Sequence, residues 1–107
     1  MRSVRAAFVA GLVLATGSVW SGTAAADNEA ALAGKQIYHS YCVICHGPNM
    51  NNPGKRSYDL RKFPLTARSR FMTVVRKGKK EMPAWGDVFS PDELDKLWAY
   101  VRTRGKI

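Results

Sequence analysis

The chain has 107 residues and a formal net charge of +9, so we expect one basic domain. Its two cysteines allow one disulfide at most, which excludes a small fold held together by several disulfides. The charge alone would suit a nucleic-acid partner, but the N-terminal segment indicates export and disfavours that class.

This segment has the three parts of a secretory signal peptide. Two arginines stand within the first five residues, the range 6–19 is apolar apart from Gly, Ser and Thr, and residues 24–26 are all Ala. The apolar stretch is shorter than the ~20 residues of a membrane-spanning helix, so we expect no stable membrane span. Removal of residues 1–26 would leave residues 27–107 as a domain with a formal charge of +7, because both arginines are lost.

A first helix is predicted over residues 29–41. Its apolar residues recur at helical spacing and form one face: Ala30, Ala33, Ile37, Tyr38 and Tyr41. The 81 residues that remain when 26 are taken from 107 make only a thin core. A fold of this size needs a further source of stability, such as a bound cofactor.

The sequence Cys42-Val43-Ile44-Cys45-His46 follows directly and matches the attachment motif of c-type haem. Two thiols at this spacing can reach both vinyl groups of one porphyrin, and the next residue places an imidazole under the iron. A disulfide or dithiol redox pair would not explain His46, and a zinc site would need more ligands than the remaining histidine, His39, supplies. We therefore predict one covalent haem c on Cys42 and Cys45, with His46 as an iron ligand.

A loop is predicted over residues 47–65, because it is rich in Pro, Gly and Asn. A second helix then covers residues 67–77, with Thr66 as its cap and Gly78 as its stop. Its buried stripe consists of Phe71, Val74 and Val75. A second loop, over residues 78–89, follows this helix.

The last helix has the clearest start signal. Residues 90–93, Ser-Pro-Asp-Glu, form a capping box with Pro at the first helical position, and Gly105 is the expected stop. The apolar face consists of Leu94, Leu97, Trp98 and Val101. No stretch alternates with a period of two, so the predicted fold class is all-α, with three main helices. Long loops are unusual in so small a domain and make sense if they wrap a cofactor.

A second iron ligand is expected if the protein carries electrons, and methionine sulfur is the usual partner of histidine. Met72 lies within the second predicted helix, where core packing is expected. Met50 is too near His46 in sequence to reach the opposite face easily. Met82 lies in a loop far enough along the chain, and Pro83 favours an extended backbone there, so we predict Met82 as the ligand.

This combined pattern resembles the class I c-type cytochromes over nearly all of residues 27–107. In that family the first helix crosses the last helix at a close contact between a glycine and an aromatic residue. Gly34 and Tyr38 match the family's residues on the first helix, and Leu97 and Tyr100 match its leucine and aromatic residue on the last helix. Residues 80–85, Lys-Glu-Met-Pro-Ala-Trp, match the family's methionine loop. The resemblance implies a cytochrome c fold whose loops wrap one covalent haem, and a monomeric electron carrier rather than an enzyme. The signal segment together with the haem motif predicts release into the periplasm of a Gram-negative cell.

The resemblance implies further contacts around the haem. In this family a backbone carbonyl orients the ligating imidazole, and Pro53 is the candidate for that carbonyl. Tyr58, Arg61 and Trp85 are candidates for hydrogen bonds to the haem propionates. An ordinary surface position is the alternative for each of them.

The resemblance extends to the partners. Residues 45–50, 59–64 and 82–85 look like those of short cytochromes that accept electrons from periplasmic quinoprotein alcohol dehydrogenases, and soluble donors to a terminal oxidase look similar. The basic residues that precede Met82 would face an acidic redox partner, or they are a solvated helix end. These residues are Arg76, Lys77, Lys79 and Lys80. A five-coordinate sensor or peroxidase-type protein is the alternative if Met82 is not a ligand.

Overall fold

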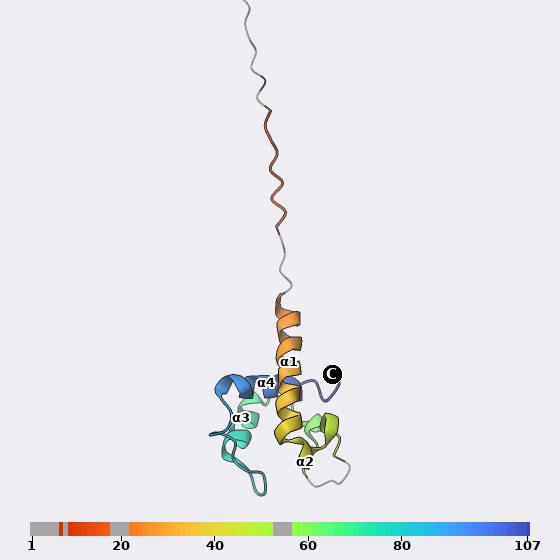
Figure 1. Cartoon of the computed structure of the whole chain (residues 1–107), viewed down its shortest axis with the longest axis vertical. Helices are drawn as coiled ribbons and strands as arrows, with labels where there is room; N and C mark the ends of the chain where they lie inside the picture. Colours follow the sequence, from red (N-terminus) through yellow and green to blue (C-terminus); the bar gives the residue numbers. More distant parts are fainter. Residues whose placement is uncertain (1–6, 8, 18–21, 53–56) are drawn as a thin grey trace, which may run out of the picture.

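The computed structural model describes residue 7 and the ranges 9–17, 22–52 and 57–107. These residues form α-helices and short 3-10 helices (Figure 1): α1 (Gly22–Tyr41), α2 (Val43–His46), η1 (Pro48–Met50), η2 (Leu60–Lys62), α3 (Arg68–Lys77) and α4 (Pro91–Val101). Within these ranges the β pairing is a single bridge between Lys79 and Met82. The all-α prediction is confirmed.

Helix α1 begins at Gly22, earlier than the predicted start at residue 29. The apolar periodicity marks only the part of the helix that packs on other elements. The alanines at 24–26 favour this longer helix, because Ala is the strongest helix former. The added turns project away from the rest of the fold (Figure 1). In the described ranges, no helix is both long enough and apolar enough to cross a membrane.

The main packing contact is the crossing of α1 and α4 at Gly34. A Cβ built on Gly34 would lie 1.9 Å from the carbonyl oxygen of Lys96, so only glycine lets the two backbones approach this closely. One turn further along each helix, the rings of Tyr38 and Tyr100 pack with centroids 5.1 Å apart. The Lys35 ammonium also donates a hydrogen bond to the Ile107 carbonyl at 2.8 Å, which ties the end of the chain to α1.

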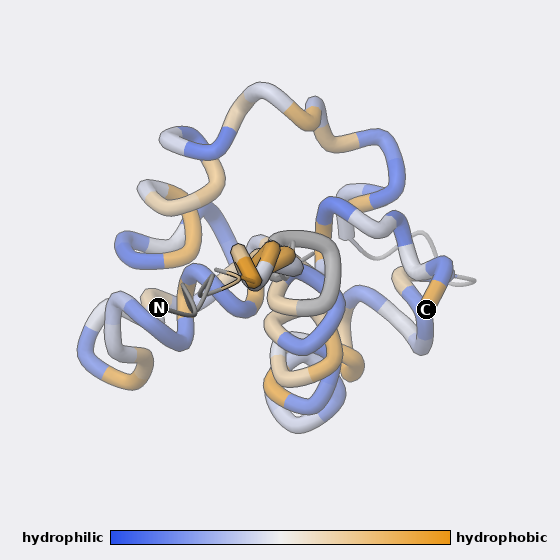
Figure 2. The backbone as a smooth tube through the Cα atoms, turned by 90° about the horizontal axis from the view of Figure 1, so that it is seen from above, coloured by the Kyte–Doolittle hydropathy of each residue, from blue (hydrophilic) through white to orange (hydrophobic). Residues whose placement is uncertain are grey.

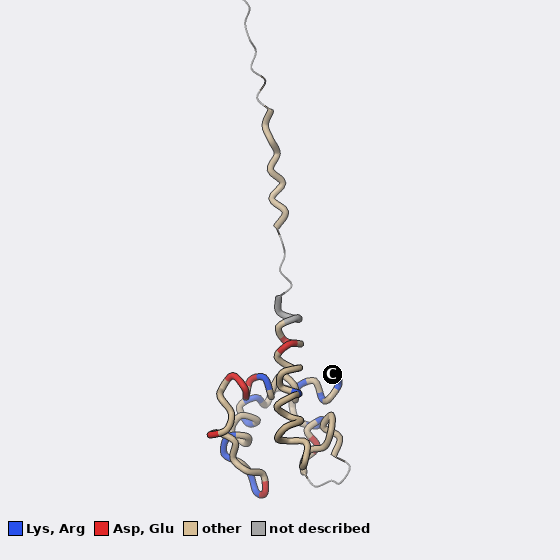
Figure 3. The backbone as a smooth tube through the Cα atoms, viewed as in Figure 1, with Lys and Arg blue, Asp and Glu red and all other residues tan. Residues whose placement is uncertain are grey.

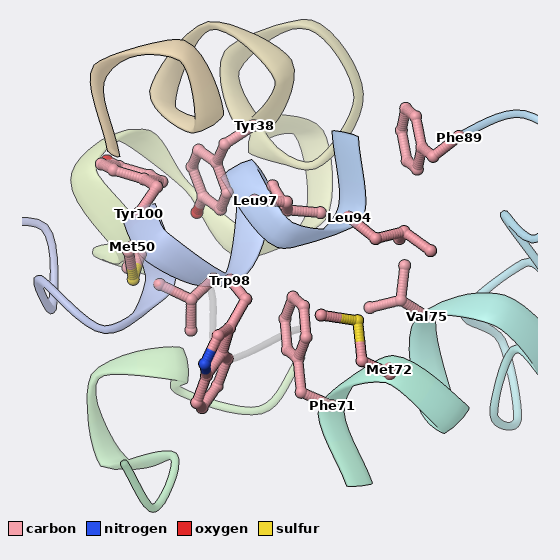
Figure 4. Close-up of a cluster of buried hydrophobic side chains, with 11 residues drawn as sticks. Tyr38, Met50, Phe71, Met72, Val75, Phe89, Leu94, Leu97, Trp98 and Tyr100 are labelled. Carbon is pink, nitrogen blue, oxygen red and sulfur yellow. The ribbon is translucent and has the colours of Figure 1, made fainter. Parts of the chain in front are cut away.

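The core forms where α1, α3 and α4 meet, and η1 closes one side of it (Figure 4). Figure 2 shows hydrophobic and hydrophilic segments alternating along the helices, as expected for elements that bury one face. The buried cluster consists of Tyr38, Met50, Phe71, Met72, Val75, Phe89, Leu94, Leu97, Trp98, Tyr100 and Val101. Met72 lies in this cluster, so its predicted role in core packing is confirmed.

The predicted capping box of the last helix is present. The Ser90 hydroxyl accepts a hydrogen bond from the Glu93 N–H at 3.2 Å, and the Ser90 N–H donates to the Glu93 carboxylate at 3.1 Å. Pro91 occupies the first turn, where its missing N–H leaves no helical bond unmade. Gly78 ends α3 as predicted.

Two predicted helix boundaries are wrong. Thr66 does not cap α3: the helix starts at Arg68, and the Ala67 at its N-cap makes no side-chain cap bond. The Ala67 N–H donates to the Pro64 carbonyl, so residues 64–67 form a separate turn before the helix. Helix α4 ends at Val101 and not at Gly105: the Thr103 and Arg104 N–H groups donate to carbonyls three residues back, at 2.9 and 3.0 Å, so the chain continues in turns.

We expect Gly34→Ala to destabilise the fold. Replacing glycine by alanine inside a helix normally stabilises it by about 0.5–1 kcal/mol. Here the methyl group would meet a backbone oxygen that cannot move without shifting α4, so we expect a loss of at least ~1–3 kcal/mol. Chemical denaturation of the two proteins measures the difference.

The matched control is Gln36→Ala, an exposed position on the same helix, where we expect unchanged or slightly increased stability. Equal or greater stability of Gly34→Ala would show that the helices do not cross at this residue.

Candidate functional site

The Cys-x-x-Cys-His motif lies where α1 ends and α2 begins. The Cys45 and His46 N–H groups both donate to the Cys42 carbonyl, at 3.2 and 2.9 Å, so one helical turn sets the relative positions of the three side chains. Cys42 is half-buried and Cys45 is exposed, and both are free thiols. The structure therefore does not support the alternative in which Cys42 and Cys45 form a disulfide.

The environment of Cys42 also disfavours the dithiol redox alternative. Burial, with a smaller contribution from the neighbouring Cys45, raises the pKa of the Cys42 thiol to about 11. A redox-active thiol needs a lowered pKa, because the thiolate is the reacting form. Cys42 is thus protonated near neutral pH.

The His46 imidazole is oriented through its Nδ1 atom. The Ser57 hydroxyl lies 3.1 Å from Nδ1 and the Tyr58 carbonyl lies 3.3 Å from it. Burial lowers the pKa of His46, and the Tyr58 carbonyl opposes this effect in part. The neutral ring, which is the form that binds metals, is therefore favoured.

Sequence reasoning missed two residues of this environment, Ser57 and Asn52. It gave Pro53 the role of orienting His46, and Pro53 lies outside the described residues. Ser57 and Asn52 sit in a loop without periodicity, and their separation from His46 follows no motif. The nearest signal was the loop's richness in Asn, which indicates side chains that bond to nearby backbone.

A buried tyrosine anchors the chain just after His46. The Tyr38 hydroxyl donates a hydrogen bond to the Gly47 carbonyl at 2.5 Å. Tyr38 is fully buried, and burial raises the pKa of its hydroxyl far above the ordinary value, so it stays a donor. The helix crossing at Gly34 and the backbone beside His46 are therefore connected through one side chain of α1.

The three methionines weighed as ligands lie in different environments. Met50 is 0% and Met72 is 6% exposed, and both belong to the core cluster. Met82 is half-buried in the loop after α3 and packs at the edge of that core. Of the three, Met82 is the methionine that lies in a loop and outside the buried cluster.

The backbone around Met82 is held by hydrogen bonds at both ends. Lys79 and Met82 exchange N–H···O bonds of 3.1 and 2.9 Å, and the Trp85 N–H donates to the Val75 carbonyl of α3 at 2.8 Å. Gly78 turns the chain with φ +74°, and a Cβ there would lie 2.6 Å from the Met82 carbonyl oxygen. The methionine loop is thus a tight turn fastened to α3.

The residues predicted to contact propionates have well-defined neighbours. Trp85 packs against Tyr41 and Phe89, with ring centroids 5.5 Å apart in both pairs. Tyr58 is 55% exposed. The Arg61 guanidinium donates two hydrogen bonds to the Asp59 carboxylate, at 2.9 and 3.0 Å. Because the Arg61 guanidinium already pairs with Asp59, the structure supports a propionate contact less well for Arg61 than for Tyr58 or Trp85. The propionate contacts of all three residues stay predictions.

Charge is distributed unevenly over the described surface. Arg76, Lys77, Lys79 and Lys80 at the end of α3 are all exposed, with Glu81 beside them. The ion pairs found among the described residues, Arg61–Asp59, Arg68–Asp95 and Lys96–Asp92, do not involve these four. Figure 3 shows basic residues around the end of α3 and acidic ones around the start of α4. The acidic group comprises Asp87, Asp92, Glu93 and Asp95.

These residues fit a covalent haem. Two free thiols and an oriented neutral imidazole lie on one helical turn, and a half-buried thioether is available in a fastened loop. Among the described residues, no three or more His, Cys, Asp or Glu side chains gather as a metal site would require. A nitrogen and sulfur donor set with two attachment thiols suits haem iron, and the described residues give the zinc alternative no support.

Comparison with known proteins agrees with this chemistry. The family model described as cytochrome C oxidase, cbb3-type, subunit III matches residues 29–101. Cytochrome c6 of Rippkaea orientalis (strain PCC 8801 / RF-1) is 32% identical over 75 residues, which are 66% of this chain and 68% of that protein. A cytochrome c6 of Nostoc sp. (strain PCC 7120 / SAG 25.82 / UTEX 2576) is 28% identical over 105 residues, 94% of this chain and 92% of the relative.

A larger protein also contains a similar stretch. Quinohemoprotein alcohol dehydrogenase ADH IIB of Pseudomonas putida is 33% identical over 79 residues, which are 71% of this chain but 11% of the dehydrogenase. The chain thus spans about a tenth of that relative's length. No solved structure matches the chain. From its fold, its motif and these relatives, the chain belongs to the class I c-type cytochromes, electron-transfer proteins that carry one covalently bound haem c.

Proposed function

We propose that this cytochrome is a periplasmic one-electron carrier of a respiratory chain. The observation that carries the proposal is the single helical turn that holds Cys42, Cys45 and His46 together, with the imidazole oriented through Nδ1. In this proposal both thiols attach the haem, and His46 and Met82 bind its iron. When bound, the haem takes up one electron at its iron and gives it back.

Each of these residues has a distinct task. The Cys42 and Cys45 thiols would hold the haem covalently, through thioether bonds to its two vinyl groups. His46 offers the lone pair of Nε2, because Nδ1 is engaged with Ser57 and Tyr58. Met82 offers a thioether sulfur, a soft donor that raises the reduction potential. The hydrogen bonds around Lys79, Met82 and Trp85 limit movement of this loop between redox states.

We propose a quinoprotein alcohol dehydrogenase as the electron donor and a terminal oxidase as the acceptor. The stretch shared with a quinohemoprotein alcohol dehydrogenase supports the first, and the match to the cbb3-type oxidase subunit family supports the second. Oxidation of an alcohol to an aldehyde releases two electrons and two protons. Two molecules of this carrier would therefore be reduced per alcohol, with the protons released to solvent.

The docking surface in this proposal is the basic cluster Arg76, Lys77, Lys79 and Lys80. These side chains are exposed and lie in the segment that leads into Met82. An acidic partner attracted to them would arrive beside the methionine loop, and opposite charges raise the rate of encounter.

Export through a signal peptide supplies the periplasmic location. The apolar residues Val9, Leu12, Val13 and Leu14 stay exposed in the structure, which suits a segment read by the export machinery rather than one that packs in a core. Helix α1 runs through Ala26 and Asp27, so cleavage between them requires this turn to be unfolded during export.

We expect the exported protein to begin at Asp27. Intact mass spectrometry of periplasmic protein measures this directly, together with the mass of one attached haem. A protein that keeps residues 1–26 would contradict the signal-peptide proposal and leave the haem proposal intact.

Substitution of Met82 by Leu should open one side of the iron. We expect the wild-type protein to show a six-coordinate spectrum and no response to carbon monoxide, whereas Met82→Leu should bind carbon monoxide readily and have a lower reduction potential. Optical spectra of both redox states with and without carbon monoxide measure this.

The matched control is Met72→Leu, the same change at a core position, which should keep the wild-type spectrum because leucine and methionine have similar volumes. If Met82→Leu also ignores carbon monoxide, Met82 is not the ligand. If the wild-type protein binds carbon monoxide, the sensor or peroxidase alternative is favoured.

Electron transfer with an acidic partner should slow as salt rises. The screening length falls from about 30 Å at 0.01 M to about 8 Å at 0.15 M ionic strength, so we expect the bimolecular rate to fall by roughly tenfold or more. Stopped-flow measurements with the wild type and with Lys77→Gln/Lys79→Gln compare the salt dependences.

The double variant should show a weaker salt dependence, whereas Lys106→Gln, an exposed change at the chain end, should keep that of the wild type. Equal slopes for all three proteins would show that the basic cluster does not steer the partner.

A further inference from the structure

The Ser57 hydroxyl stands at the centre of a small polar cluster beside the haem motif. It donates a hydrogen bond to the Cys45 carbonyl at 2.7 Å and lies 3.1 Å from His46 Nδ1. The Asn52 amide donates to the Ser57 hydroxyl oxygen at 3.1 Å and to the Ser57 carbonyl at 2.7 Å. One hydroxyl therefore contacts two consecutive residues of the motif, and Asn52 holds that hydroxyl in place.

Counting hydrogens assigns the proton on the imidazole. The Cys45 carbonyl can only accept a hydrogen bond, so the Ser57 hydroxyl donates its single hydrogen to this carbonyl. The hydroxyl oxygen has two lone pairs, of which Asn52 takes one and His46 Nδ1 faces the other. Nδ1 must then be the donor in this contact. The Tyr58 carbonyl, which also only accepts, faces the same atom at 3.3 Å and leads independently to the same conclusion.

We propose that Ser57, held by Asn52, is a positioning residue that fixes the tautomer and the orientation of His46. With the hydrogen on Nδ1, the lone pair lies on Nε2, the nitrogen that is free to bind iron. The inference rests on the proposed ligation by His46 and adds a side-chain acceptor to the carbonyl that the family resemblance implies. Unlike a backbone carbonyl, this acceptor is removed by one substitution.

The cluster also sets the strength of the ligand. An acceptor on Nδ1–H makes the imidazole a stronger donor to its metal, which favours ferric over ferrous iron and lowers the reduction potential. Removing the Ser57 hydroxyl leaves only the longer contact to the Tyr58 carbonyl. The Ser57→Ala protein should therefore have a higher potential than the wild type.

The first measurement uses the wild-type holoprotein. In the diamagnetic ferrous state, NMR should show a slowly exchanging Nδ1–H of His46 with a nuclear Overhauser effect to the β protons of Ser57. The absence of this effect in a protein with covalent haem and His46 ligation would overturn the inference and leave the proposed function standing. A wild-type protein without covalent haem would overturn both.

The second measurement compares reduction potentials by spectroelectrochemistry. We expect Ser57→Ala to shift the midpoint upward, by up to the ~59 mV that a tenfold change in ferric-to-ferrous preference represents for one electron, and to speed exchange of Nδ1–H. Ser57→Thr keeps the hydroxyl and should restore both values.

The control is Ser40→Ala, because the Ser40 hydroxyl bonds only to the carbonyl of Gln36 on the exposed side of α1. It should leave both values unchanged. A Ser57→Ala protein with wild-type potential and exchange, or a Ser57→Thr protein that behaves like Ser57→Ala, would overturn the assignment.

Discussion

The close approach of two backbones at Gly34 is the constraint on which the rest of the structure depends. It brings α1, near the start of the described fold, against α4, near its end, so the segments between them must close into loops around the remaining space. Cys42 follows α1 directly, and its position is therefore set by the helix crossing. The bond from Tyr38 to the Gly47 carbonyl extends the same constraint past His46, so the attachment motif is fixed at both of its ends.

The methionine loop depends on α3. Its last residues hold the methionine loop through the bonds from Trp85 and Gly86 to the carbonyls of Val75 and Arg76, and its buried face joins α4 in the core. His46 lies in α2, directly after α1, and Met82 lies in the loop directly after α3, and both α1 and α3 pack on α4. With His46 and Met82 as the proposed ligands, this arrangement would suit an electron carrier, because little would have to move when the charge of the iron changes.

Sequence-based predictions were most accurate where a few neighbouring residues determine the local structure. The Cys-x-x-Cys-His motif, the capping box at Ser90 and the glycine at position 34 each depend on residues within one or two helical turns, and the fold confirms the capping box and the crossing. The predictions were wrong at two helix ends: α3 begins one residue later than predicted and has no side-chain cap, and the chain after α4 forms turns before it reaches Gly105. Ser57 could not have been predicted, because a loop without periodicity brings it to His46.

The separation of charge along the molecule has a consequence for how it meets other proteins. Basic residues surround the end of α3 and acidic residues the start of α4 (Figure 3), and the ion pairs of Asp92 and Asp95 neutralise only part of the acidic group. The molecule therefore has a permanent electric dipole moment as well as a net charge. In the field of a charged partner it experiences a torque, and it turns before contact is made. For an acidic partner of the kind proposed, this rotation would shorten the orientational search, because the basic end of the dipole lies beside the methionine loop.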